Sequence, residues 1–262
     1  MASSDVVLLK LGGSVLTFKH QPLSFNTEAA QAICNALASL RRPLVIVHGG
    51  GSFGHFFASK HHLSRSLTQA SPKGVAETKS AMVDLHLRVL RHLQEAGIAP
   101  FSLPPVSLLE DRGLRPSTAR LLNRLLENQL SPVTFGDVIQ VRGGFRVVSG
   151  DTLMFELARI LRPATAVFAL DVDGVYQDPD RRKTPLKELQ AGGKGFRYLS
   201  RRLASRVPDA TGGILFKLQE AGRIANQGTE VYFINGLKPE RMVKALNGGT
   251  LEGTLIKGRT RG

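Results

Sequence analysis

The sequence predicts one α/β domain built on a mainly parallel sheet. Two features support this fold class: apolar runs of strand length alternate with segments of helical apolar spacing, and several runs end in glycine-rich loops. The chain has 262 residues, 42% of them hydrophobic, so it can bury a full core. Because ligands bind at the carboxyl ends of parallel strands, we expect the glycine loops to form one ligand-binding edge.

The first two strands are expected at 6–11 and 43–47, joined by a crossover helix over 26–40. Asn26 supplies a capping residue for that helix, and apolar residues follow it at helical spacing. A βαβ unit of this kind is right-handed and lays its strands in one sheet. The loops that follow the two strands should therefore be neighbours.

The rest of the chain continues the alternation. Helices are expected at 73–95, 117–129 and 150–161, with another beginning near 210. Strands are expected at 98–103, 164–170 and 230–234, and a hairpin is expected to pair 138–141 with 145–148. Residues 178–198 carry many charges, glycines and prolines, and we expect them to form an exposed excursion.

Net charge narrows the classes of partner. The chain carries 35 Lys and Arg against 21 Asp and Glu, a formal net charge of +14. The excess is spread over both halves without a basic tail, and with three Tyr and no Trp there are few rings that would stack on bases. We therefore expect anionic small molecules, and no nucleic acid, as ligands.

The single cysteine, Cys34, indicates the redox environment of the protein. A lone cysteine at an apolar helix position excludes an internal disulfide and favours a reducing environment. The sequence has no N-terminal signal pattern and no apolar run approaching the ~20 residues of a membrane span. These features predict a cytoplasmic protein without a membrane partner.

The most informative stretch is Val45-Ile-Val-His-Gly-Gly-Gly-Ser-Phe-Gly-His55. A strand runs into three consecutive glycines, 49–51, which are flanked by His48 and His55. Backbone N–H groups of the glycines can face a phosphate, and a helix following at Phe56 would add its N-terminal dipole. A plain tight turn would need only one or two glycines. We interpret the stretch as an anion-binding loop.

Two better-known phosphate-binding motifs do not fit this loop. Gly49, Gly51 and Gly54 satisfy G-x-G-x-x-G, but the dinucleotide fingerprint should open the first βαβ unit and precede an acid that ends the next strand. This loop ends the second predicted strand instead, and the next acid, Glu77, lies in a helical stretch. No G-x-x-x-x-G-K-[ST] motif is present, which excludes the ordinary P-loop.

Charged residues stand beside the other loops. Lys10 interrupts an apolar run just before Gly12-Gly13-Ser14, either to meet an anion or to reach water from the strand end. Asp151 opens a predicted helix, where it could also act only as a capping acid. Asp171-Val-Asp-Gly-Val-Tyr176 places two carboxylates at a strand end, and Lys217 follows a Gly-Gly turn.

Together these motifs resemble the amino acid kinase superfamily, whose members bind ATP without a P-loop. They stand in the family's order: Lys10-Leu-Gly-Gly-Ser14, His48-Gly-Gly-Gly51, Ser149-Gly-Asp151, Asp171-Val-Asp-Gly-Val-Tyr176 and Thr211-Gly-Gly213 with Lys217. The resemblance implies an open three-layer αβα sandwich over residues 1–262. The part up to about residue 160 would mainly bind the phosphate acceptor, and the part from about residue 161 mainly the nucleotide.

Within the superfamily, Gly51-Ser-Phe-Gly-His55 is similar to the loop that holds the substrate phosphate in isopentenyl phosphate kinases. Lys73-Gly-Val-Ala-Glu-Thr78 and Ser102-Leu-Pro-Pro105 are also similar to archaeal-type members. The implied reaction converts ATP and isopentenyl phosphate to ADP and isopentenyl diphosphate, on an alternative mevalonate route to isoprenoids. Two alternatives stay open: a fosfomycin kinase, which has a comparable histidine, and a non-catalytic nucleotide-binding protein.

The resemblance also assigns roles to residues. Those implied for catalysis are Lys10, Lys19, His55, Asp151 and Lys217, with Lys19 neutralising charge in the transition state. Those implied to bind the nucleotide are Lys10, Gly12, Gly13, Ser14, Gly51, Asp171, Asp173, Gly212, Gly213 and Lys217. Those implied to bind the acceptor phosphate are Gly50, His55 and Gly150. Mg²⁺ would bridge the ATP phosphates without a protein ligand, and the family's usual state is a homodimer.

The isopentenyl tail requires an apolar pocket beyond His55. The predicted helix over 73–95 is expected to wall it, with Met82 and Val83 at its floor. His86 lies one turn further on, where we expect a core histidine.

Overall fold

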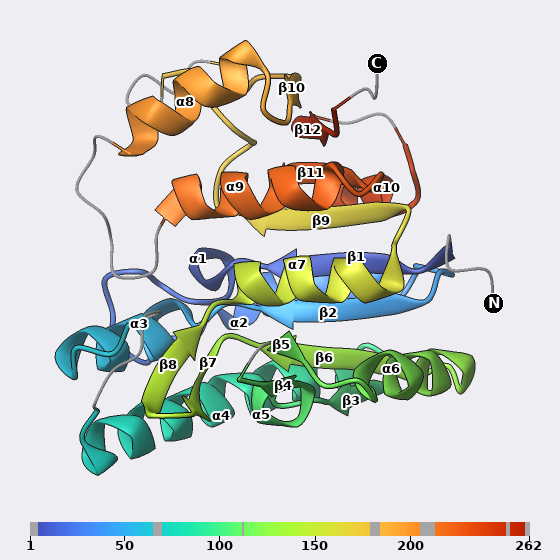
Figure 1. The fold of residues 1–262 in the computed structure, drawn as a ribbon. Coiled ribbons are helices and arrows are strands. Elements are labelled where there is room, and N and C mark those ends of the chain that lie inside the picture. The colour runs from blue at the N-terminus through green and yellow to red at the C-terminus, as the bar shows by residue number, and fades with distance from the viewer. Residues whose placement is uncertain are drawn as a thin grey trace.

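The computed structural model describes residues 5–64, 70–111, 113–178, 184–204, 213–249 and 252–259. Within these ranges, one large sheet has helices on both faces (Figure 1). Its strands are, in sheet order, β10 (Glu188–Gln190), β12 (Thr254–Lys257), β11 (Glu230–Asn235), β9 (Thr165–Leu170), β1 (Val7–Leu11), β2 (Leu44–His48), β6 (Ser131–Phe135) and β3 (Pro100–Ser102). The strands from β11 to β3 are parallel, and β12 and β10 run the opposite way.

Helices cover the two faces of this sheet. One face carries α6 (Thr118–Glu127), α7 (Gly150–Leu161), α8 (Lys194–Ala204) and α9 (Gly213–Ala225), and the other carries α2 (Thr27–Leu37), α4 (Pro72–Glu95) and α10 (Pro239–Leu246). Apolar cores fill the space between the sheet and each helix layer. This layering confirms the αβα sandwich. None of the helices that the structure describes is both long and apolar enough to cross a membrane.

The central strands are buried on both faces. In β1, Leu8 packs into one core while Val7 and Leu9 pack into the other, and every residue of the strand is buried. A strand covered by helices on both faces has a nearly continuous apolar sequence, and β1, which is apolar except for Lys10, is therefore recognisable from the sequence. The register pairs Leu11 with His48, so the glycine loops that follow β1 and β2 leave the sheet side by side.

Two helices begin in these loops. The short α1 (Gly13–Leu16) follows β1, and α3 (Gly51–Lys60) follows β2. The expected start of the second helix at Phe56 is wrong, because α3 already begins at the third glycine. His55 therefore lies on a helix rather than in a loop.

Smaller elements lie outside the large sheet. Strands β7 (Asp137–Val141) and β8 (Gly144–Val148) form the predicted antiparallel hairpin. The other short elements are α5 (Pro105–Leu108), β4 (Leu109–Glu110) and β5 (Gly113–Leu114).

Two further parts of the fold differ from the sequence-based expectation. Strand β6 is not predicted, because Ser131-Pro-Val-Thr-Phe135 contains a proline and two hydroxyl residues and lacks a strand pattern. The exposed excursion expected at 178–198 is wrong in its second half: β10 extends the sheet, with Leu189 buried, and α8 begins at Lys194 and packs against α9. Residues 179–183 lie outside the described ranges.

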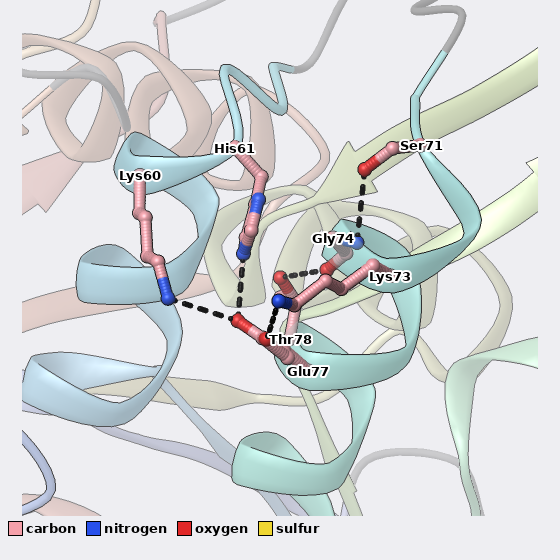
Figure 2. Close-up of polar contacts among 7 residues, drawn as sticks. All are labelled: Lys60, His61, Ser71, Lys73, Gly74, Glu77 and Thr78. Atoms are coloured by element: carbon pink, nitrogen blue, oxygen red, sulfur yellow. Dashed lines mark hydrogen bonds and ion pairs between the residues drawn. The ribbon is translucent and has the colours of Figure 1, made fainter.

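Ion pairs fasten the hairpin and α3 to the long helix α4. Lys79 Nζ lies 2.6 Å from Oδ2 of Asp137, whose side chain is only 3% exposed. At the other junction, Lys60, the last residue of α3, and His61, which follows it, contact the Glu77 carboxylate at 3.1 and 2.8 Å (Figure 2). The long helix α4 thus contacts both α3, which follows β2, and the hairpin, which follows the neighbouring strand β6.

Removing Lys79 should destabilise the fold. Lys79→Ala leaves the buried Asp137 carboxylate without its cation, so we expect the free energy of unfolding to fall by about 2 kcal/mol. Lys73→Ala is the matched control on the same helix: its side chain is 79% exposed and 3.8 Å from Glu77, and such pairs contribute little. Urea unfolding compares the variants, and equal losses would contradict the prediction.

Candidate active site

The glycine loops after β1 and β2 pack backbone against backbone. A Cβ on Gly13 would lie 2.3 Å from the Gly51 nitrogen, so no side chain fits between the loops. Gly51 has φ +47°, in the left-handed region that favours glycine. Thr17 connects the loops, because its hydroxyl donates to the Gly13 carbonyl at 2.7 Å and accepts from the Ser52 N–H at 2.9 Å. The two loops therefore form one rigid surface of backbone groups.

The N-terminus of α7 lies against the same edge. A Cβ on Gly150 would be 3.2 Å from the His48 carbonyl oxygen and 3.2 Å from Cε of Lys10. Ser149 caps the helix by accepting a hydrogen bond from the Thr152 N–H at 3.1 Å. The positive ends of the α3 and α7 dipoles thus both lie at the glycine loops, an arrangement that attracts anions.

Lys10, Asp151 and Lys217 form a charged cluster at this edge. Lys10 Nζ donates to Oδ1 of Asp151, and Lys217 Nζ lies 3.6 Å from Oδ2. Burial lowers the pKa of Lys10 to about 8, although the Asp151 charge opposes the shift. Burial alone would raise the pKa of Asp151, but the two lysines outweigh it and hold this pKa below its ordinary value. Lys10 and Asp151 are both charged at neutral pH, and Lys217 leaves the cluster net positive.

A cavity with two chemically different parts opens beside the cluster. Its polar part is lined by the three charged residues and by backbone of Gly13, Gly50 and Gly150. Its apolar part is lined by Ala58 of α3, Met82 of α4, and Val138 and Val147 of the hairpin, and His55 of α3 also faces it. The cavity can therefore take a ligand with an anionic head and a short apolar tail.

The cavity brings together about half of the residues predicted for the site. These are Lys10, Gly13, Gly50, His55, Gly150, Asp151 and Lys217. Gly12, Ser14 and Gly51 belong to the adjoining loops and α1 and α3 without lining the cavity. Lys19 is exposed on the turn after α1, and Gly213 begins α9; neither is part of the lining. Gly212 lies outside the described residues.

The two predicted carboxylates after β9 also lie outside the lining. Asp171 is exposed. Asp173 accepts hydrogen bonds from Lys238 at 3.0 Å, Asn235 at 3.1 Å and Arg241 at 2.8 Å, and those from Lys238 and Asn235 lower its pKa. Asp173 thus connects the loop after β9 to the end of β11 and the start of α10.

Sequence reasoning missed the hairpin wall and misplaced part of the helical one. Gly136 and Asp137 line the cavity because they follow β6 at the same carboxyl edge, but without a predicted β6 that signal was hidden. Met82 lines the cavity as expected. The expectation for Val83 is wrong: its side chain is 46% exposed, since one residue along a helix turns the side chain to another face.

Two buried histidines join the glycine loop after β2, residues 49–51 and hereafter the phosphate loop, to α4: His48 ends β2, and His86 belongs to α4. His48 Nε2 is 3.0 Å from His86 Nδ1, and both rings pack on Phe135. The expected core position of His86 is confirmed. Burial lowers the pKa of His48 to about 4 and that of His86 to about 3, the His48 charge adding to the second shift. Both rings are neutral at neutral pH.

Comparison with known proteins agrees with this site. The chain matches the amino acid kinase family over residues 5–235. The isopentenyl phosphate kinase of Thermoplasma acidophilum is 33% identical over 240 residues, covering 90% of this chain and 94% of its own. That of Methanothermobacter thermautotrophicus is 30% identical over 266 residues, covering 97% and 100%. The crystal structure of the T. acidophilum isopentenyl phosphate kinase product complex superimposes with a TM-score of 0.79 at 30% identity, covering 96% and 100%.

The chain belongs to the amino acid kinase family, the class of phosphotransferases that its fold and its non-P-loop phosphate site define. Within that family it belongs to the group of the isopentenyl phosphate kinases.

The buried histidine pair should make stability sensitive to acid. Unfolded histidines protonate near ~6.5, whereas His48 and His86 do so only at about 4 and about 3 when folded. Between these values the unfolded chain binds more protons, so the free energy of unfolding falls as the pH drops below ~6.5. Urea unfolding at neutral pH and at about pH 5 measures the loss.

Carboxylates also contribute to the loss of stability at acid pH, and two variants separate their effect from that of the histidine pair. His86→Gln should lose less stability between the two pH values than the parent protein, and the exposed His20→Gln should lose as much as the parent. The same loss in all three proteins would contradict the assignment.

Proposed function

We propose that this protein transfers the γ-phosphoryl group of ATP to isopentenyl phosphate, giving ADP and isopentenyl diphosphate. The observation that carries the proposal is the cavity in which the Lys10, Asp151 and Lys217 cluster adjoins a short apolar pocket beside His55. The cluster suits a phosphate and the pocket suits a small alkyl group. Kinship with isopentenyl phosphate kinases supports the same substrate, and the kinase family supplies ATP as the donor.

Phosphoryl transfer to this acceptor requires cations that neutralise charge rather than a general base. A phosphate monoester has its second pKa near ~6, so the acceptor is mostly a dianion at neutral pH and needs no proton removed. The obstacle is repulsion between two polyanions. Lys10 and Lys217 counter it from one side, and backbone N–H groups at the α3 and α7 N-termini add fixed positive ends. Asp151 holds the two ammonium groups in place.

Residue roles follow this division. His55 and the backbone of Gly50 and Gly150 grip the acceptor phosphate, while Lys10 and Lys217 hold the ATP phosphates. Apart from Lys10 and the glycine loops, which also contact ATP, residues up to about 160 would serve mainly the acceptor, and residues from about 161 mainly the nucleotide.

Further nucleotide contacts come from the edges of the cavity. Gly12, Ser14 and Gly51 present backbone from the β1 and β2 loops. Asp171, Asp173, Gly212 and Gly213 contribute from the C-terminal part.

Mg²⁺ would be held by the nucleotide. Among the described residues, no three His, Cys, Asp or Glu side chains are grouped so as to hold a metal ion. Asp151 is committed to its two lysines. The donor set thus fits an ion that binds ATP phosphate oxygens, where it would reduce the charge of the donor.

We further propose a homodimer and a cytoplasmic location. Val83 and Leu87, one turn apart on α4, are 46% and 45% exposed, and Phe101 on the adjacent edge strand β3 is 39% exposed. These side chains suit a contact with a second copy. Sedimentation velocity tests the dimer, and Leu87→Asp should yield monomers. The unpaired, buried thiol of Cys34 favours a reducing compartment.

A coupled ADP-release assay tests the function. Isopentenyl phosphate should support turnover, and fosfomycin should give little. Turnover with fosfomycin alone would favour the phosphonate kinase alternative, and turnover with neither would favour a nucleotide-binding protein without catalysis.

Lys19 should act mainly in the transition state. It is exposed on a turn beside the glycine loops, so a bound nucleotide could bring it to the γ-phosphoryl group. Lys19→Ala should lower kcat by more than about tenfold with little change in KM for ATP. Steady-state kinetics decide the matter, and a change confined to KM would assign Lys19 to ground-state binding.

His55 should donate a hydrogen bond to the acceptor phosphate. A glutamine amide can replace one imidazole N–H, so His55→Gln should keep part of the activity and His55→Ala should lose most of it. The loss should fall on isopentenyl phosphate and spare the KM for ATP. Equal activity of the parent protein and both variants would exclude the contact.

Met82 should limit the length of the acceptor's tail. The Met82 side chain packs closely against α3: a Cβ placed on Gly54 of that helix would lie only 2.7 Å from the Met82 sulfur. Met82 therefore fills the part of the pocket beside α3. Met82→Ala should raise kcat/KM for geranyl monophosphate relative to isopentenyl phosphate. Each additional CH₂ group that the enlarged pocket buries should stabilise the bound acceptor by about 0.8 kcal/mol. Val83→Ala is the matched control, because its side chain faces outward. An unchanged preference in Met82→Ala would place the tail elsewhere.

A further inference from the structure

A continuous chain of hydrogen bonds runs from the edge of the sheet to the phosphate loop. Ser102 Oγ on β3 lies 2.9 Å from His86 Nε2, His86 Nδ1 lies 3.0 Å from His48 Nε2, and His48 Nδ1 lies 3.1 Å from the Gly49 carbonyl oxygen. Both imidazoles are buried, and Ser102 is exposed. The function described above uses none of these side chains.

The last acceptor fixes the direction of every bond in this histidine chain. A carbonyl oxygen only accepts, so His48 Nδ1 must carry the proton. A neutral imidazole has a single N–H, so His48 Nε2 accepts and His86 Nδ1 donates to it. His86 Nε2 in turn accepts, from the Ser102 hydroxyl. Because burial keeps both rings neutral, one tautomer of each ring satisfies the chain.

The bond from His48 orients one peptide group of the phosphate loop. The peptide between Gly49 and Gly50 is trans, so its carbonyl and N–H point in opposite directions. With the oxygen held by the His48 ring, the Gly50 N–H points away from the ring. Gly50 lines the cavity, and in the part of the chain that the structure describes its N–H donates to no other group.

Two glycines in a row would otherwise leave this peptide free to turn over. Gly49 and Gly50 have no Cβ to restrict their dihedral angles, and a flipped peptide would present a carbonyl oxygen to an anion. The His48 bond opposes that flip. It does so with a neutral ring, which adds no charge to compete with the lysines for the ligand.

We propose that His48 and His86 are positioning residues, which hold the Gly49–Gly50 peptide with its N–H facing the acceptor phosphate. The inference rests on the proposed function for the identity of that phosphate. His86 acts through His48 by supplying the hydrogen bond that keeps its tautomer. Ser102 is the replaceable end of the chain, because it is exposed and a water molecule can take the place of its hydroxyl.

Kinetics of three variants test the role. His86→Phe keeps an aromatic ring on Phe135 but removes the donor to His48, and it should raise KM for isopentenyl phosphate at least about tenfold while KM for ATP stays unchanged. His86→Asn places an amide N–H at the position of Nδ1 and should restore the KM to within about threefold of the parent value. Ser102→Ala should match the parent protein.

A packing control separates this role from a structural one. Phe135→Leu disturbs the stack of rings without removing a hydrogen bond of the chain, so it should lower Tm and leave KM for isopentenyl phosphate unchanged. Should His86→Phe behave in the same way, with a lower Tm and the parent's KM, or should His86→Asn fail to restore the KM, the positioning role is overturned.

A spectroscopic measurement tests the tautomers without any substrate. Nitrogen-15 chemical shifts of His48 in the full-length parent protein should show the proton on Nδ1, and His86→Phe should move part of the population to Nε2. A parent protein with the proton on Nε2 of His48 refutes the inference, whether or not any variant folds. Absence of turnover with isopentenyl phosphate would refute the proposed function instead, and the nitrogen shifts would still decide the histidine chain.

Discussion

The ion pair between Lys10 and Asp151 is the interaction on which the site depends. Lys10 stands on the central strand β1 and is 4% exposed, so an unpaired ammonium there would be costly. Asp151 stands in the first turn of α7. Pairing them places the start of that helix over the carboxyl ends of β1 and β2. Buried pairs of this kind add little net stability, and their effect here is to fix position and keep a cation at the sheet edge.

The second constraint is steric. The loops after β1 and β2 touch through backbone alone, and α7 packs closely on them at position 150, where a Cβ would lie 3.2 Å from the His48 carbonyl oxygen. The three glycine motifs are thus one structural requirement: three chain segments must converge without side chains between them. The backbone N–H groups exposed by that convergence are what the site offers to phosphates.

Sequence patterns were informative where burial is complete or where backbone geometry requires glycine. β1, β2 and β9 are covered on both faces, and α7 has its capping serine and first-turn acid in sequence, so these elements could be recognised. These patterns left the roles of Lys10 and Asp151 open, and it was the family resemblance that placed Lys10, Asp151 and Lys217 in one site. The ordered motifs then identified the family before any contact was known.

What could not be predicted depends on tertiary contacts. Strand β6 takes its conformation from pairing with β2 and β3, not from its own sequence. Strand β10 is held by β12, which lies some seventy residues further along the chain. The partnership of Lys79 with Asp137 and that of His48 with His86 join segments whose separation in sequence hides their proximity. Local periodicity contains no information about such pairs.

The position of the β7–β8 hairpin has an evolutionary consequence. The hairpin forms its own two-stranded sheet, inserted between β6 and α7, and among the described residues no strand of the large sheet pairs with it. It nevertheless supplies one apolar wall of the cavity through Val138 and Val147. Substitution, lengthening or exchange of this insert could change the acceptor a kinase of this fold accepts while the phosphate-transfer groups on β1, α7 and α9 stay as they are. Diversification of substrates would then require change in a single short segment.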